Sequence, residues 1–182
     1  MSLYRSLCIV LVVSALVMMP MVAGAVVVGD PPAVGAVAPE VALTSNEGKK
    51  VNLKDYRGQW VVLYFYPKDF TSGCTLEAHN FQRDLAKYEQ MKAVILGVSV
   101  DTAESHKDFC TKEGLSFKLL SDPNAKVSNE YGSVMDYQGT TYSARNTFII
   151  DPKGKIAKVF VKVKPAGHSD EVLQALAELQ KS

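Results

Sequence analysis

This sequence has little of three things that often reveal a function: cysteine, histidine and net charge. Its 182 residues include three cysteines and three histidines, and the net charge is +1. A nearly neutral chain without a basic stripe argues against nucleic acid as a partner. The histidines lack the spacing of metal ligands, so no metal is implied. Nothing in the sequence implies an organic cofactor either. They stand at His79, His106 and His168.

The first 25 residues have the pattern of an export signal. Arg5 gives a positive start, residues 7–22 are almost wholly apolar, and Ala23-Gly24-Ala25 fits a cleavage site. We therefore expect a signal peptide over 1–25, export to the periplasm and a linker over 26–36. In the alternative, the uncleaved segment anchors the chain, because an apolar run of this length can span a bilayer. After cleavage no second apolar span follows, so no membrane contact is expected.

Residues 37–182 have the size of one globular domain with one core. Two apolar runs, 61–66 and 93–100, predict central strands covered on both faces. Apolar spacings of three and four predict one helix through Ala78 to Tyr88 and another that Ser169 caps. Further strands are predicted at 41–43, 50–53, 117–120, 147–150 and 156–161, and further helices at 102–113 and 126–131. This order predicts an α/β fold, a thioredoxin-like sandwich with a central mixed β-sheet and helices on both faces.

Cys74 stands in an informative position. The segment 61–77 leads a buried strand into a turn at Pro67 and places Cys74 in the first turn of a helix. Backbone N–H groups and the helix dipole favour a thiolate there, so we expect the pKa of this thiol to fall. Thr71 can cap the helix or donate its hydroxyl proton to a group that approaches the sulfur. The alternative is a small apolar core residue.

The cysteine count leaves two interpretations open. Signal cleavage would remove Cys8 and leave Cys74 and Cys110 in an oxidising compartment, where a pair is by default a structural disulfide. A domain of this size does not need such a bond, so a redox-active pair is the other interpretation. Thr71-Ser-Gly-Cys74 lacks the first cysteine of Cys-x-x-Cys, which argues against a disulfide oxidoreductase. A binding module with a static disulfide is the non-enzymatic alternative.

Residues 66–77, Tyr-Pro-Lys-Asp-Phe-Thr-Ser-Gly-Cys-Thr-Leu-Glu, resemble the Pro-x-x-x-Thr-x-x-Cys signature of peroxiredoxins. Glu77-Ala78 resembles the bacterioferritin-comigratory or Q-type branch, and three later segments are similar to that branch too: 119–122, 144–151 and 168–173. The resemblance implies a thiol peroxidase that reduces hydrogen peroxide and organic hydroperoxides.

The resemblance also implies roles for single residues. Cys74 would be the peroxidatic cysteine and become a sulfenic acid, while Thr71 would hold the peroxide oxygens. Pro67 would shield the sulfur, and Arg145 would stabilise the thiolate and the charge on the leaving oxygen. Without the resemblance, Arg145 could equally be a surface arginine that pairs with an acid. Glu77 could either suit the helix dipole or orient Arg145.

The chain departs from that branch at two positions. Ser72 stands where many members have proline, and His79 stands where many have a resolving cysteine. The resemblance leaves Cys110 as the resolving cysteine, with an inert buried thiol as the alternative. A disulfide needs Cα atoms within about 7 Å, so we expect both helices to unwind locally. The resemblance further implies recycling by thioredoxin or a similar dithiol, and a monomer.

Overall fold

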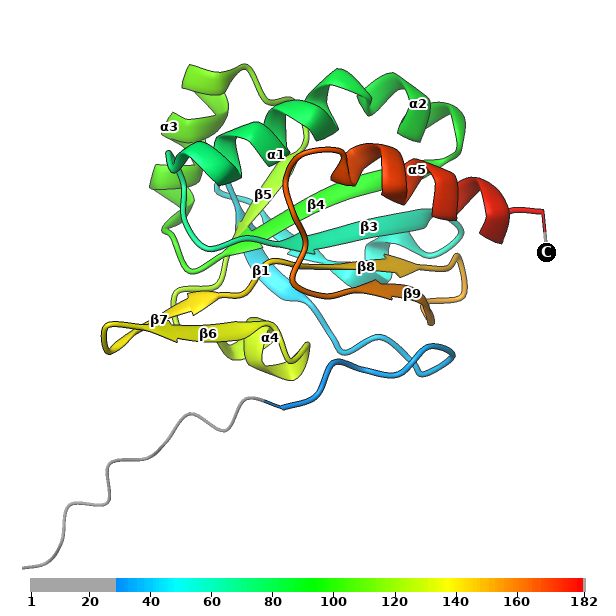
Figure 1. Cartoon of the computed structure of the whole chain (residues 1–182), viewed down its shortest axis with the longest axis horizontal. Coiled ribbons are helices and arrows are strands. Elements are labelled where there is room, and N and C mark those ends of the chain that lie inside the picture. Colours follow the sequence, from blue (N-terminus) through cyan, green and yellow to red (C-terminus); the bar gives the residue numbers. More distant parts are fainter. Residues whose placement is uncertain (1–28, 182) are drawn as a thin grey trace, which may run out of the picture.

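The structure is a computed structural model that describes residues 29–181 (Figure 1). The predicted signal peptide and the first residues of the predicted linker lie outside this range. Within it the chain forms a seven-stranded sheet in the order β2-β1-β5-β4-β3-β8-β9 and a two-stranded hairpin, β6-β7. The strands are β1 (Ala42–Ser45), β2 (Lys50–Asn52), β3 (Trp60–Phe65), β4 (Ala93–Ser99), β5 (Lys118–Ser121), β6 (Val134–Tyr137), β7 (Thr140–Ser143), β8 (Asn146–Ile150) and β9 (Ile156–Phe160). The helices are η1 (Leu53–Tyr56), α1 (Ser72–Arg83), α2 (Leu85–Gln90), α3 (Ala103–Glu113), α4 (Lys126–Glu130) and α5 (His168–Leu179).

The centre of the sheet is parallel and its edges are antiparallel. β3 pairs in parallel with β4, and β4 with β5, whereas β8 runs antiparallel to β3. The predicted mixed sheet is therefore confirmed. The carboxyl ends of β3 and β4 meet at one edge, so the turn before α1 and the start of α3 lie there together.

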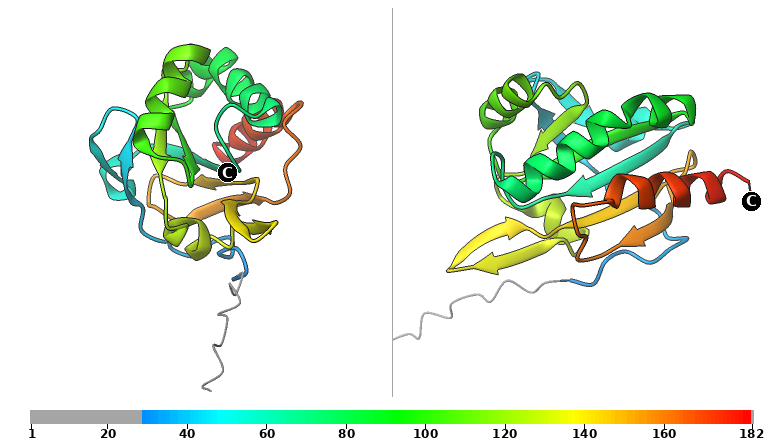
Figure 2. Two further views of the ribbon diagram at one scale, coloured as in Figure 1. Left: turned by 90° about the vertical axis from the view of Figure 1, so that its left-hand side faces the viewer. Right: turned by 45° about the horizontal axis from the view of Figure 1, so that its top comes forward.

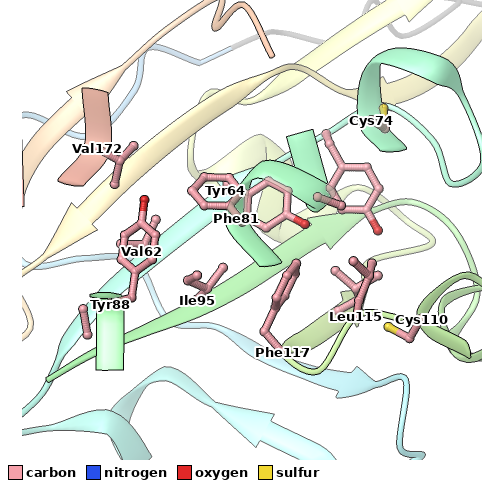
Figure 3. Close-up of a cluster of buried hydrophobic side chains, with 14 of the residues drawn as sticks. Val62, Tyr64, Cys74, Phe81, Tyr88, Ile95, Cys110, Leu115, Phe117 and Val172 are labelled. Carbon is pink, nitrogen blue, oxygen red and sulfur yellow. The ribbon is translucent and has the colours of Figure 1, made fainter. Parts of the chain in front are cut away.

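Successive side chains of β3 point into two different clusters, as the period of a strand requires. Val62 and Tyr64 face a cluster closed by α1, α2, α3 and α5, which Figure 3 shows in close-up. Val61 and Leu63 face a second cluster, which α4 and the segment around Val41 help to cover. Both faces of the central strands are thus buried, which explains why their sequences are apolar without alternation.

Gly97 is required where β4 passes under an aromatic ring. A Cβ on Gly97 would lie 2.7 Å from the Tyr64 hydroxyl and 2.6 Å from Leu119 Cδ2. Tyr64 and Gly97 are direct partners in the parallel register, and the Tyr64 ring packs on Phe81 at 4.8 Å between centroids. The missing side chain therefore lets α1 pack close to the sheet.

The single helix predicted through Ala78 to Tyr88 is wrong: two helices, α1 and α2, divide at Asp84. Asp84 is buried, and its carboxylate accepts hydrogen bonds from Arg83, Lys87 and Ser169. The hydrogen bond from Arg83 contributes most to holding the pKa of Asp84 well below its usual range. The Asp84 carboxylate thus stabilises the break between α1 and α2, and one of its partners, Ser169, is remote in sequence.

Ser169 is not the N-cap of the last helix, contrary to the prediction. α5 begins at His168 after Gly167, whose φ of 81° is in the region that favours glycine. The Ser169 hydroxyl donates instead to Asp84 Oδ2 at 2.9 Å, and it fixes α5 beside the break between α1 and α2. Figure 2 shows α1 and α5 side by side on one face of the sheet. The β6-β7 hairpin, which was not predicted, extends from the rest of the domain.

The segment that enters the domain is hydrogen-bonded to β9 and the turn before it. Gly35 N–H donates to the carbonyl of Ile156 at 2.7 Å, and Ile156 N–H donates to the carbonyl of Ala36 at 2.9 Å. Val37 then forms a bridge with Lys155. No helix in residues 29–181 is long and apolar enough to cross a membrane.

Candidate active site

Cys74 is the third residue of α1, directly after the turn that follows β3. Its side chain is buried, with 2% of the residue exposed. Cys74 therefore lies in the first turn of the helix, where the backbone N–H groups have no partner within the helix. These groups and the helix dipole favour negative charge at this end. The structure thus places Cys74 as the sequence predicted.

The turn before α1 is shaped by bonds at both of its ends. Tyr66 N–H donates to the carbonyl of Val98, and Asp69 N–H donates to Asp101 Oδ2 at 2.9 Å. Phe70 has a φ of 62°, a conformation that is rare for a bulky residue. The two ends are held by the neighbouring strand and by the loop after it, so the chain enters α1 in one fixed direction.

Thr71 and Pro67 line this turn. Thr71 is the N-cap residue of α1 by position, but its side chain makes no capping bond. Its hydroxyl donates to the carbonyl of Lys68 at 3.0 Å and is exposed at the mouth of the turn. Pro67 is half-buried directly after β3. The hydroxyl proton is thus committed to Lys68, contrary to the expectation that Thr71 donates it to a group near the sulfur, but the Thr71 oxygen keeps its lone pairs free to accept a hydrogen bond from a molecule that approaches Cys74.

Arg145 reaches Cys74 from the loop between β7 and β8. Its Nη2 donates to Cys74 Sγ at 3.3 Å, and its own carbonyl accepts from Val163 N–H at 2.9 Å. A Cβ on Gly73 would lie 3.4 Å from the same Nη2, so the glycine leaves room for the guanidinium. Of the two interpretations of Arg145, the structure supports the one in which it serves the sulfur rather than the surface.

Glu77 holds the other side of that guanidinium. Arg145 Nη1 donates to Glu77 Oε2, whereas Glu77 Oε1 is buried without a hydrogen-bond partner among the described residues. Burial raises the pKa of Glu77 to about 7, although the neighbouring Arg145 opposes the shift. Burial acts to lower the pKa of Arg145, but Glu77 and Cys74 outweigh it and raise that pKa. The arrangement decides the open question on Glu77, because this carboxylate orients the arginine.

Cys110 lies apart from this group, on α3. Both cysteines are free thiols and border the same apolar cluster, where Figure 3 shows them on different helices at one end. Burial raises the pKa of Cys110 to about 12, with a smaller contribution from Asp69. A static disulfide is therefore not what the structure describes, and Cys110 is a poor nucleophile as long as it stays buried.

A buried pair near the site was not predicted. His106 is fully buried, and its Nδ1 lies 2.9 Å from Asp69 Oδ2. The two residues are 37 positions apart, so local patterns carried no signal for the pairing. Among residues 29–181, no group of three or more His, Cys, Asp or Glu side chains is placed to hold a metal ion.

Comparisons with known proteins agree on one family. Residues 34–159 match the AhpC/TSA family. The chain is 42% identical over 147 residues to a putative peroxiredoxin bcp of Helicobacter pylori, an alignment that covers 79% of this chain and 97% of the relative. It is also similar to a cysteine-to-serine mutant of PrxQ from Xylella fastidiosa, with a TM-score of 0.73, 34% identity and coverage of 78% of this chain and 95% of that one. For the bacterioferritin comigratory protein of Xanthomonas campestris, the TM-score is 0.72 at 36% identity, with coverage of 76% and 90%.

Proposed function

Because this chain belongs to the AhpC/TSA family, and within it to the Bcp or PrxQ peroxiredoxins, we propose that its peroxidase reaction takes place at Cys74. As a peroxiredoxin it is a thiol-dependent peroxidase. The Xanthomonas campestris relative is described as having alkyl peroxide reduction activity, which supports organic hydroperoxides as substrates beside hydrogen peroxide. The 3.3 Å contact between Arg145 Nη2 and Cys74 Sγ is the observation that carries the assignment of the site.

In the first step, the Cys74 thiolate attacks one oxygen of the peroxide and the O–O bond breaks. The sulfur becomes a sulfenic acid, and the other oxygen takes up a proton and leaves as water or an alcohol. Negative charge moves from the sulfur to the leaving oxygen, so groups that are already fixed around both atoms lower the barrier. Arg145 and the N–H groups of the first turn of α1 have this position.

Two further residues act on the peroxide in this proposal. The exposed Thr71 hydroxyl, with free lone pairs, accepts a hydrogen bond from the peroxide O–H and orients it. Pro67 closes the turn beside the sulfur and has no N–H group that would compete for the peroxide. Both roles rest on the position of the turn next to Cys74.

In the second step, the Cys110 thiol attacks the sulfenic acid of Cys74. An S–S bond forms, and the hydroxyl leaves with the thiol proton as water. A thioredoxin-type dithiol then reduces the bridge and restores both thiols. Cys110 is buried on another helix, so the step requires α1 and α3 to open locally before the sulfurs can meet.

We also propose that the chain is exported and works as a monomer. Residues 1–25 have the composition of a cleavable signal, and a periplasmic enzyme would need a dithiol donor in the same compartment. Intact mass of the chain expressed in a Gram-negative host would show a mature protein that starts at Val26, whereas the full-length mass would favour the anchored alternative.

The test of the active site is peroxide consumption with a thioredoxin-type dithiol in excess. Wild-type chain and Cys74→Ser are compared, with Thr111→Ala as a matched control on an exposed face of α3. We expect turnover in wild type and in the control, and none above background in Cys74→Ser. Full turnover in Cys74→Ser would contradict the proposal.

A further inference from the structure

A buried polar cluster joins the active-site turn to α3, the helix that carries Cys110. The Asp69 carboxylate accepts from Ser105 Oγ and from Tyr66 OH, each at 2.7 Å, and its Oδ2 lies 2.9 Å from His106 Nδ1. The Asp69 and His106 side chains are 1% and 0% exposed. Bonds of this kind, buried and made to a charged acceptor, are stronger than those between neutral partners at the surface.

An aromatic contact joins the same two elements one residue further along. The Phe70 ring meets the Phe109 ring edge to face at 5.0 Å between centroids, and Lys112 Nζ lies 5.4 Å from the Phe70 centroid. Phe109 is the neighbour of Cys110 in sequence. The turn therefore contacts α3 at a second place, directly beside Cys110 in sequence.

The contacts between the active-site turn and α3, called the joint below, include two features that cost free energy. Phe70 is held at a φ of 62°, which a residue with a bulky side chain adopts only under constraint. His106 Nε2 is buried without a hydrogen-bond partner in the described part of the chain. Burial acts to raise the pKa of Asp69, but the bonds from His106, Ser105 and Tyr66 outweigh it and lower that pKa. Asp69 is thus kept as the charged acceptor, and both costs are released when the joint opens.

We propose that Asp69 and Phe70 form a latch on α3, which must open before Cys110 can reach the oxidised Cys74. The latch is defined by the contacts of Asp69 with Ser105 and His106, and by that of Phe70 with Phe109. It rests on the proposed function, since it assumes that Cys110 is the resolving cysteine. Asp69 and Ser105 are positioning residues for the second step, because they set how often the thiol is released.

Other ties between α1 and the region of α3 are weaker. His79 Nε2 lies 3.0 Å from Glu113 Oε2, and Gln82 bonds to Ser116. His79 is 48% exposed and the Gln82 bonds are exposed too, so solvent competes with these contacts. The latch contacts are therefore the ones that decide how often Cys110 becomes exposed.

The test measures how fast Cys110 is alkylated in the reduced full-length chain without peroxide. Peptide mapping separates the Cys110 signal from those of Cys8 and Cys74. Ser105→Ala removes one bond to Asp69, Asp69→Asn weakens all of them, and Thr111→Ala is the control on the same helix with a hydroxyl bond that stays within α3. Alkylation needs an opening, so loss of a buried bond to a charged acceptor should raise its rate roughly 10-fold or more.

Amide hydrogen exchange shows where the opening occurs. We expect faster exchange in 68–71 and α3 of Ser105→Ala, with β3 and β4 unchanged, and a wild-type Cys110 rate in Thr111→Ala. An unchanged Cys110 rate in both latch variants would overturn the latch. So would an equal rise across the sheet, which would indicate global destabilisation.

The rate of bridge formation after peroxide separates this inference from the proposed function. If wild type forms no Cys74–Cys110 bridge, the resolving role is wrong whatever the alkylation shows. If wild type forms the bridge but Ser105→Ala does not form it faster, the latch is wrong and the peroxidase assignment stands. Ser105 touches neither sulfur in the described contacts, so its variant should leave the oxidation of Cys74 itself unchanged.

Discussion

Arg145 donates a hydrogen bond to Cys74 across 3.3 Å, although 71 positions separate the two residues in the sequence. The guanidinium comes from the loop before β8, and the sulfur from the first turn of α1. Because β3 and β8 pair directly, the sheet brings the two together. The reactivity of the site depends on this contact and on the groups that hold it.

Replacing Arg145 by lysine should slow the oxidation of Cys74 strongly. Lysine keeps a charge but cannot bond the sulfur and Glu77 at the same time with a planar fork. Loss of one fixed donor that stabilises developing charge typically costs on the order of 100- to 1,000-fold in rate. Stopped-flow fluorescence with hydrogen peroxide would measure the second-order rate constant.

Arg57→Lys is the control for that measurement, since Arg57 is exposed and outside the site. Its rate constant should match wild type. If Arg145→Lys is also within about 3-fold of wild type, a smaller effect than a lost donor of this kind produces, Arg145 does not stabilise the transition state.

Cys110→Ser should separate the two steps of the cycle. Cys74 should still be oxidised by the first equivalent of peroxide, because Cys110 lies on a different helix and makes no described bond to it. Turnover with a thioredoxin-type dithiol should fall, and excess peroxide should carry Cys74 further to sulfinic acid. Intact mass spectrometry counts the added oxygens, and normal recycling in this variant would show that an outside thiol resolves Cys74 directly.

Glu77→Gln should change how stability depends on pH. The pKa of Glu77 is raised in the folded chain to about 7, from an ordinary 4.5, because of burial. Between these values the folded state holds a proton that the unfolded state releases, so this group makes the chain less stable as pH rises from about 4.5 to 7 and has no further effect above. The free energy of unfolding falls by about 3 kcal/mol at most over this pH range because of Glu77.

Urea unfolding at pH 5 and pH 8 measures this difference. Relative to wild type, Glu77→Gln should gain stability at pH 8 but not at pH 5, whereas the exposed Glu178→Gln should follow wild type at both. Parallel curves for wild type and Glu77→Gln would contradict the raised pKa.

Gly97→Ala should destabilise the fold by about 1–3 kcal/mol, since its Cβ would clash with Tyr64 and Leu119 in a packed core. Tyr64→Phe is the companion variant, because the Tyr64 hydroxyl is buried without a hydrogen-bond partner among the described residues. Its loss should be neutral or stabilising. Thermal unfolding of both variants checks the packing, and a wild-type midpoint for Gly97→Ala would show that the core can adapt.

The features that the sequence predicted are those set by neighbouring residues. The apolar run 93–100 became β4 at Ala93–Ser99, and the helix predicted at 102–113 became α3 at Ala103–Glu113, which ends at Gly114 with a φ of 67°. The predictions were wrong where a residue remote in sequence determines the local structure. The break at Asp84 depends on Ser169, 85 positions away, and the same bond takes Ser169 out of its expected cap.

The β6-β7 hairpin escaped prediction because β6 is mostly exposed and lacks an apolar stripe. At the site, the position of Cys74 followed from local pattern, whereas the partner of Arg145 came only from a family resemblance. That Arg145 bonds Cys74 and Glu77 at the same time, and that Asp69 contacts α3, could be seen only in the tertiary structure.

The most direct measurement is peptide mapping of the reduced wild-type chain after one equivalent of hydrogen peroxide. We expect a disulfide between Cys74 and Cys110 to account for the oxidised protein, and a dithiol reductant to open it again. A Cys74 that still alkylates in full after the peroxide is consumed, or a bridge from Cys74 to another thiol, would contradict this mechanism.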